Sequence, residues 1–192
     1  MRHVSLLLAV MIAALTLVPD LVAQQDPRLE NLKAEAEQMI QDRAKLAQEI
    51  IDHLFSFGEL GMQEFETQRY LTGLLEEEGF DIELGVAGMP SAWTATWSNG
   101  SGEPVIALGS DVDGIPQSNQ KPGVAYRDPI LSMAPGHGEG HNTGQAVNIV
   151  AAIVVKELMQ RDGINGTLLI WPGVAEEQVA SCLLYTSPSP RD

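Results

Sequence analysis

The densest group of chemically capable side chains lies in residues 136–142, which read Gly-His-Gly-Glu-Gly-His-Asn. Imidazole nitrogens and carboxylate oxygens are both good ligands for zinc-like ions. The intervening glycines let the backbone bend, so that His137, Glu139 and His141 can converge on one point. Because the segment lies between a strand-like and a helix-like stretch, we favour a metal site over the alternative of a surface Gly/His loop.

Two acidic pairs, Asp111 with Asp113 and Glu176 with Glu177, each follow an apolar run that is typical of a central strand. Ligand sites in open α/β sheets collect beyond the carboxyl ends of strands. Taken singly, either pair also fits a plain acidic turn. Two-metal hydrolysis explains the adjacent glutamates better, because one carboxylate can bind metal while its neighbour takes a proton from water.

Hydrophobic periodicity predicts the elements that must position these groups. Helices are expected at residues 27–57, 65–78 and 144–161. Strands are expected at residues 81–86, 92–97, 104–109 and 166–172, with a long irregular loop over residues 114–140. The apolar stripe of the first helix is expected to pack in the core, and the third helix, apolar nearly all round, is expected to be buried. Alternating strands and helices predict an α/β fold with a mostly parallel or mixed sheet.

Short-range signals add three details to this arrangement. Asn99-Gly100 predicts a tight hairpin turn between the second and third strands. Residues 105–108 are apolar on both faces, which is typical of a central strand. Asn142 or Thr143 is expected to cap the third helix.

Length and charge narrow the class of protein. The chain has 192 residues, of which 44% are hydrophobic and 19% charged, as in a single globular domain. Its formal net charge of -15 argues against nucleic-acid binding, because phosphate backbones repel such a chain. Solubility explains the acidity more simply than a cation site does, so the charge alone predicts no metal.

The first residues have the outline of a signal peptide. Arg2 and His3 precede an apolar run over residues 4–18, and Ala23 is a small residue at the expected cleavage point. The run is short for a membrane span. We therefore expect residues 1–23 to be removed from a periplasmic or secreted protein that has no stable membrane span. The alternative is an uncleaved N-terminal anchor.

The last residues are not expected to belong to the natural protein. Residues 182–192 contain the only cysteine, Cys182, and have neither helical nor strand periodicity. They look like the translation of a sequencing-library adapter, and the alternative is a natural Ser-Pro tail. The natural part would then be residues 24–181, an N-terminal part of a catalytic domain whose gene continues further. An exported protein without disulfides fits a bacterial periplasm.

Taken in order, the three site segments and residues 59–64 resemble the aminoacylase/carboxypeptidase family of cocatalytic-metal peptidases. The nearest branch is that of the amidohydrolases that include aminobenzoyl-glutamate hydrolase, and the resemblance covers residues 55–180. It implies a three-layer α/β sandwich with a mixed, mostly parallel sheet, the zinc-peptidase-like catalytic domain, here truncated. It also implies that the full-length protein is a homodimer held by an inserted domain that this sequence lacks.

The family's active-site residues match positions of this sequence one by one. Glu176 matches the general base, Glu177 the metal ligand beside it, and His141 a histidine ligand. Asp113 matches the aspartate that orients a ligand beside the metals, so it counts with Glu176 as catalytic. Glu139 stands where this branch usually has a bridging cysteine. A carboxylate there resists oxidation and favours zinc, manganese or cobalt.

Two further positions have less defined roles in the resemblance. Asp111 stands where many relatives have a metal-binding histidine, and we keep it as an additional candidate metal ligand. His137 matches a motif residue that is not a clear ligand. We expect His137 to contact the substrate or to support a ligand.

The resemblance implies a metal-dependent amidohydrolase that uses two divalent ions and a glutamate base. Its substrate would be a small N-acyl or N-aroyl amino acid or a dipeptide. Later ligands of the family do not occur in these residues, so we expect the chain alone to be inactive and to bind metal weakly. The alternatives are a non-catalytic periplasmic metal-binding module, with Glu139 and His141 as ligands, and an oligomerisation scaffold without metal. Glu176 discriminates the hydrolase from the metal-binding module, because a binding protein needs no base beside a ligand.

Overall fold

The computed structural model describes residues 26–178. The expected signal peptide (residues 1–23) and the expected adapter-derived segment (residues 182–192) lie outside the described residues. Within the described part of the chain, no helix is both long and apolar enough to cross a membrane. The chain divides into two compact units, residues 1–35 and 36–192, and the fold below is that of the second unit.

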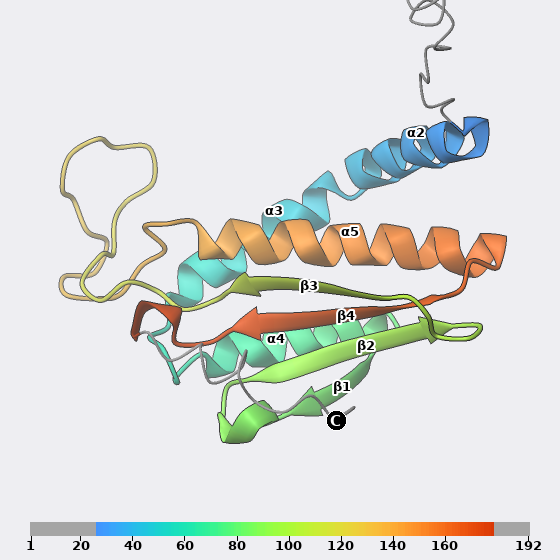
Figure 1. Ribbon diagram of the computed structural model, residues 1–192. Helices are drawn as coiled ribbons and strands as arrows, with labels where there is room; N and C mark the ends of the chain where they lie inside the picture. The colour runs from blue at the N-terminus through green and yellow to red at the C-terminus, as the bar shows by residue number, and fades with distance from the viewer. Residues whose placement is uncertain (1–25, 179–192) are drawn as a thin grey trace, which may run out of the picture. The chain divides into compact units, whose positions relative to one another are not determined.

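The helix expected over residues 27–57 is broken at Arg43 into α2 (Pro27–Asp42) and α3 (Ala44–Phe57) (Figure 1). Arg43 has φ -102° and ψ 11°, and its guanidinium pairs with Glu157 at 2.5 Å. The apolar spacing continues across this residue, so periodicity alone does not reveal the break. The predicted core stripe is buried in α3 but not in α2, where no residue is buried, and for α2 the prediction is wrong.

A mixed four-stranded sheet forms the centre of the fold. Its strands are β1 (Asp81–Leu84), β2 (Trp93–Asn99), β3 (Val105–Asp111) and β4 (Gly166–Gly173), in the order β1-β2-β4-β3. Both β1 and β4 pair with β2 antiparallel, whereas β3 pairs with β4 in parallel. The α/β class and the mixed sheet are therefore confirmed, with two antiparallel pairings and one parallel pairing among the described strands.

The hairpin expected at Asn99-Gly100 is wrong, because β4 lies between β2 and β3. The side chain of Asn99 instead donates hydrogen bonds to the carbonyls of Met159 (3.2 Å) and Ile164 (2.9 Å). The strand expected to be central, β3, lies at the edge of the described sheet, and Ile106 is 46% exposed. An apolar run predicts a strand but does not say which strands flank it.

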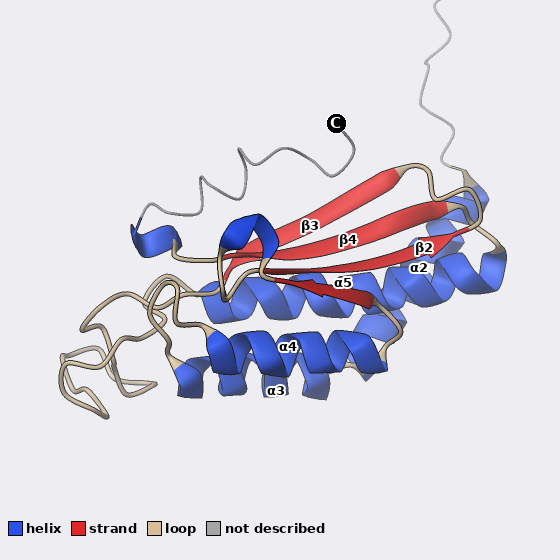
Figure 2. Ribbon diagram, turned by 90° about the horizontal axis from the view of Figure 1, so that it is seen from below, coloured by secondary structure: helices blue, strands red, loops and turns tan. Residues whose placement is uncertain are grey.

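Helices α3, α4 (Phe65–Glu77) and α5 (His141–Asp162) lie on one face of the sheet (Figure 2). The side chains between helices and sheet form the core, which includes Ile50, Leu54, Leu71, Leu75, Trp93, Ile149, Ile153, Leu168 and Ile170. Residues 26–178 thus show the sheet and one helical layer of the expected sandwich.

Helix α5 begins at His141, before the expected start at residue 144. Asn142 and Thr143 therefore lie in its first turn, and the prediction that either caps the helix is wrong. The residue before the helix is Gly140, at φ 104°. This backbone conformation favours glycine because a Cβ would clash there. Glycine thus allows a sharp entry that brings His141 onto the first turn.

The segment between β3 and α5 contains no helix or longer strand, as expected, and two contacts fold it back. Ile115 and Gly136 form an isolated β-bridge. The backbone N–H of Gly114 donates to the carbonyl of Glu59 at 2.7 Å. These contacts bring both ends of the long loop to the carboxyl end of β3, where the candidate site lies.

Candidate metal centre

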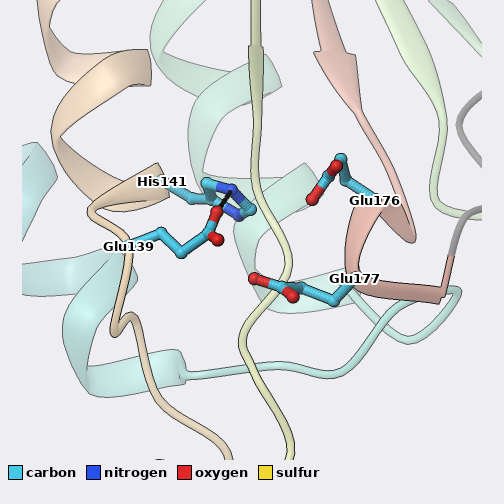
Figure 3. A group of neighbouring side chains, drawn as sticks. All are labelled: Glu139, His141, Glu176 and Glu177. Carbon is cyan, nitrogen blue, oxygen red and sulfur yellow. Dashed lines mark ion pairs between the residues drawn. The ribbon is translucent and has the colours of Figure 1, made fainter.

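Four side chains with metal-ligand chemistry meet beyond the carboxyl ends of β3 and β4 (Figure 3). Each of Glu139, His141, Glu176 and Glu177 offers one ligand atom, and these atoms all lie within 4.8 Å of one another. The first two come from the start of α5 and the residues before it. The glutamate pair comes from the short helix η2 (Glu176–Gln178), which follows β4. The structure thus brings together the three predicted ligands and the predicted base.

Asp113 connects the two halves of this group. It is buried, at 1% exposure, and its carbonyl accepts a hydrogen bond from His141 Nδ1 at 2.8 Å. Its Oδ2 accepts a hydrogen bond from the backbone N–H of Glu177 at 3.0 Å. Because a carbonyl oxygen only accepts, Nδ1 carries a proton, and in the neutral ring Nε2 keeps its lone pair for a ligand. Asp113 therefore positions a predicted ligand on either side.

Carboxylates surround the ring of His141. Its Nε2 lies 3.0 Å from Glu139 Oε2, and its Nδ1 lies 3.6 Å from Asp113 Oδ1. Burial lowers the pKa of His141, but the hydrogen bond to the Asp113 carbonyl and the charges of Asp111, Asp113 and Glu139 outweigh it and raise the pKa above its ordinary value. The site therefore favours positive charge at this position, whether a proton or a bound cation supplies it.

Three buried carboxylate oxygens at the site have no hydrogen-bond partner among the described residues: Asp111 Oδ1, Asp113 Oδ1 and Glu177 Oε1. Burial is the main cause that raises the pKa of all three carboxyl groups, because desolvation disfavours the anion. A buried, unpaired charge is costly, and a bound cation removes that cost. The residues, with their oxygen and nitrogen donors, therefore fit divalent metal ions.

Asp111 lies beside the four-residue group and not within it. Its Oδ1 is so close to Gly173 that a Cβ on Gly173 would lie 1.7 Å from it. The end of β4 therefore needs a glycine here to leave room for the carboxylate. The structure puts Asp111 next to the group, and its role as an additional ligand stays a prediction.

His137 is tied to α3 and is not among the four grouped residues. Its Nε2 lies 2.9 Å from the carbonyl of Leu54, so Nε2 donates. Its Nδ1 is buried without a partner in residues 26–178, and burial lowers the pKa of the ring. This contact fastens the long loop to α3, and a contact between His137 and the substrate stays a prediction.

Two buried polar residues beneath the site were assigned no role from the sequence. Glu64, at 1% exposure, accepts hydrogen bonds from the hydroxyl of Ser91 and, at 2.8 Å, from the N–H of Ala175. Gln145, which is fully buried, donates from Nε2 to the carbonyl of Ser110 at the end of β3. A polar residue inside an apolar stretch was the only signal for Gln145. Glu64 lies before a helix and in the segment 59–64 that resembles the family, but neither signal indicates a role for its side chain.

Comparison with known proteins identifies relatives, although no protein-family model matches the chain. The chain is 32% identical over 129 residues to a subunit of the p-aminobenzoyl-glutamate hydrolase of Escherichia coli (strain K12), a match that covers 67% of this chain and 26% of that protein. It is 31% identical over 129 residues to N-acetyl-L-cysteine deacetylase of Bacillus subtilis (strain 168), a match that covers 65% of this chain and 28% of that protein. The chain thus spans about a quarter of the length of these curated relatives.

A solved structure adds evidence on the fold. The aminobenzoyl-glutamate utilization protein from Klebsiella pneumoniae superimposes with a TM-score of 0.54 at 13% identity, over 78% of this chain and 43% of that chain. At this identity the likeness shows a shared fold alone. Sequence relatives, fold and the order of the site segments all agree with one another. The chain therefore belongs to the aminoacylase/M20 amidohydrolase family.

Proposed function

We propose that this chain supplies metal ligands and the general base of a two-metal amidohydrolase, which cleaves an amide bond in N-acyl or N-aroyl amino acids or dipeptides. The convergence of Glu139, His141, Glu176 and Glu177 within 4.8 Å carries the proposal. The names of the two curated relatives, a hydrolase of p-aminobenzoyl-glutamate and a deacetylase of N-acetyl-L-cysteine, support an amide-linked acyl or aroyl amino acid as the substrate.

In this proposal Glu139, His141 and Glu177 hold two divalent ions (zinc, manganese or cobalt), with Asp111 as an additional ligand. When bound, the ions supply Lewis acidity, which makes water easier to deprotonate and an amide carbonyl easier to attack. The carbonyl of Asp113 accepts a hydrogen bond from His141 Nδ1 and so keeps the Nε2 lone pair available to the site. Glu139 serves as a ligand that does not oxidise, unlike a cysteine.

Glu176 acts as the general base in the proposed reaction. It takes the proton from the attacking water and passes it to the nitrogen of the leaving amine. Its carboxylate lies in the same group as that of Glu177, so the proposed base and a proposed metal ligand are adjacent residues. This arrangement supports a hydrolase over a metal-binding module, which has no use for a base.

The test begins with the gene, because we expect the 192-residue chain alone to be inactive. Amplification of the source DNA past the codon for Ser181 is expected to reveal a continuing frame in place of the codons for residues 182–192. The encoded protein is then assayed with zinc, manganese or cobalt on N-acyl amino acids and p-aminobenzoyl-glutamate. A gene that ends as the present sequence does would favour the metal-binding module or the scaffold.

Within that protein, Glu176→Gln is expected to lower kcat by about 10²–10⁴-fold while metal content stays unchanged. The matched control is Glu83→Gln, on an exposed position of β1. A wild-type kcat for Glu176→Gln would contradict the assignment of the base. Metal binding without turnover in the wild type would favour the non-catalytic module, and no metal binding would favour the scaffold.

We also propose that the protein is exported to the periplasm or secreted, and that its full-length form is a homodimer with no nucleic-acid partner. The pattern of residues 1–23 supports export. Mass spectrometry of the periplasmic fraction after expression in a bacterium is expected to find a mature N-terminus at Gln24. Retention of residues 1–23 would point to an uncleaved anchor.

A further inference from the structure

We propose that Glu64 is a positioning residue for the metal centre. Its buried carboxylate holds Ala175 in a left-handed backbone conformation and thereby aims Glu176 and Glu177 at Glu139 and His141. This inference rests on the proposed function, because it assigns Glu64 a task in building the same site. Glu64 itself is not one of the four grouped residues, and it acts on them through the backbone.

The contacts of Glu64 join two segments that lie far apart in the sequence. Glu64 stands directly before α4, and its Oε1 accepts a hydrogen bond from the backbone N–H of Ala175 at 2.8 Å. Its Oε2 accepts a hydrogen bond from the hydroxyl of Ser91. Both Glu64 and Ala175 are buried, at 1% and 0% exposure. A buried carboxylate needs such partners, and the Ser91 bond fixes the rotamer that reaches Ala175.

Ala175 adopts a backbone conformation that alanine normally avoids. Its φ is 53°, in the left-handed region where the Cβ of an L-residue is crowded by the backbone. Such a residue persists only where its surroundings hold it, and strained residues cluster at functional sites. The hydrogen bond from its N–H to Glu64 is the specific contact that holds this conformation.

Gly61 is the second residue that supports the conformation of Ala175. A Cβ on Gly61 would lie 2.7 Å from the Cα and 2.8 Å from the Cβ of Ala175, so only glycine permits this close approach. The side chain of Gln178 also donates to the Gly61 carbonyl, at 3.4 Å. The turn over residues 61–64 therefore supports the chain on both sides of the glutamate pair.

The conformation of Ala175 sets the direction of the next two residues. After β4 the chain turns at Ala175 into η2, and the side chains of Glu176 and Glu177 then face Glu139 and His141 (Figure 3). The N–H of Glu177 is fixed from the other side by Asp113 at 3.0 Å. With Glu64 removed, one of these two anchors is lost, and Ala175 can relax to an ordinary conformation that points the glutamates elsewhere.

The test compares wild type, Glu64→Ala and Glu64→Gln in the 192-residue chain. The glutamine keeps an oxygen that accepts from the Ala175 N–H and an amide that bonds with the Ser91 hydroxyl. Leu71→Ala, a fully buried substitution in the core of α4, controls for loss of stability alone. Two readouts are needed: hydrogen exchange of the Ala175 amide without metal, and affinity for Zn²⁺ alone by calorimetry.

For Glu64→Ala we expect exchange of the Ala175 amide to rise about 10-fold or more. We expect its Zn²⁺ affinity to fall about 10–100-fold, as for other groups that support a ligand. Glu64→Gln should restore both readouts to near wild type. Leu71→Ala should lower stability and leave Zn²⁺ affinity unchanged.

Unchanged Ala175 exchange in Glu64→Ala would overturn the inference. So would faster exchange with wild-type Zn²⁺ affinity, because Glu64 would then be structural only. Failure of the proposed function would give a different result: wild type and His141→Ala would bind Zn²⁺ with the same affinity. That result would contradict the inference that Glu64 positions metal ligands. The exchange rate of the Ala175 amide would still show whether Glu64 holds the turn at Ala175.

Discussion

The two ends of the sheet differ in how fully their buried polar side chains are hydrogen-bonded. At the end where β3 and β4 begin, the polar groups pair with one another. Asn99 donates to the carbonyls of Met159 and Ile164. Thr167 donates to the carbonyl of Gly102 at 2.7 Å and shares a hydrogen bond with the hydroxyl of Ser98 at 2.8 Å. The bonds of Asn99 join the end of β2 to the end of α5, those of Thr167 join β4 to β2 and to the turn after β2, and both stabilise the fold.

At the end where β3 and β4 finish, buried carboxylates are held without full compensation. Asp111, Asp113 and Glu177 each have a buried oxygen without a partner in the described part of the chain. The backbone is strained there as well, since Ala175 lies at φ 53°. A sequence that satisfies its polar groups at one end of a sheet and not at the other indicates that the second end is shaped for a ligand.

The largest effect expected from this comparison is on metal binding. His141→Ala removes a nitrogen ligand, so we expect Zn²⁺ affinity to fall about 100-fold or more. His53→Ala, on the exposed face of α3, is the matched control and should leave Zn²⁺ affinity unchanged. Equilibrium dialysis of both variants measures the difference. Equal affinities in the two variants would mean that the carboxyl end of the sheet is not the binding site.

The next largest effect is on stability, and it concerns the opposite end. Asn99→Ala removes two partly buried hydrogen bonds, those to the carbonyls of Met159 and Ile164, and we expect the free energy of unfolding to fall by about 1–3 kcal/mol. The carbonyl of Met159 keeps its backbone donors, the N–H groups of Gly163 and Ile164. Zn²⁺ affinity should not change. Urea unfolding measures the loss, with Ser101→Ala in the exposed turn as the control. A change in Zn²⁺ affinity with Asn99→Ala would contradict the division of tasks between the two ends.

The chemistry of the site could be predicted from the sequence because its signals are local. Glu139 and His141 lie within one short segment, and Glu176 and Glu177 are adjacent. Each segment follows a predicted strand or precedes a predicted helix, and carboxyl ends of parallel strands meet at one edge of a sheet. Local patterns therefore predict that all four residues lie at one edge of the sheet.

The strand order and the positioning residues could not be predicted, because they depend on contacts between distant segments. The hairpin expected at Asn99-Gly100 fails because β4, which comes much later in the chain, pairs with both neighbours. Glu64 meets Ala175 across 111 positions of sequence. The spacing of residues within either segment does not reveal such a contact. The left-handed conformation of Ala175 is also not predictable, because alanine, unlike glycine, does not favour it.

A smaller effect separates the two ends in the absence of metal. Asp111→Asn neutralises a carboxyl group whose buried Oδ1 has no hydrogen-bond partner within residues 26–178, so we expect the metal-free chain to become more stable by about 1 kcal/mol at neutral pH. The same change should weaken Zn²⁺ binding. Urea unfolding in a chelator measures the gain, with Asp81→Asn on an exposed position of β1 as the control. A loss of stability would show that the carboxylate has a partner of its own in the metal-free protein.

The smallest effect is a dependence on pH at Glu64. Burial raises the pKa of Glu64, and the hydrogen bonds from Ser91 and Ala175 offset this only in part. A carboxyl group whose pKa is raised on folding contributes stability below its ordinary value of 4.5 and loses it as the pH rises through the raised value. Glutamine does not titrate, so Glu64→Gln should be more stable than wild type at pH 8 by less than about 1 kcal/mol.

This advantage of Glu64→Gln should shrink as the pH falls toward 4.5. Urea unfolding in a chelator across this pH range measures the difference, and Asn99→Ala, whose lost bonds are neutral, should show a loss that does not vary with pH. A constant difference between Glu64→Gln and wild type would show that the buried carboxyl keeps its ordinary pKa. The energetic cost at this end of the sheet would then come from the left-handed backbone of Ala175 and not from the buried charge of Glu64.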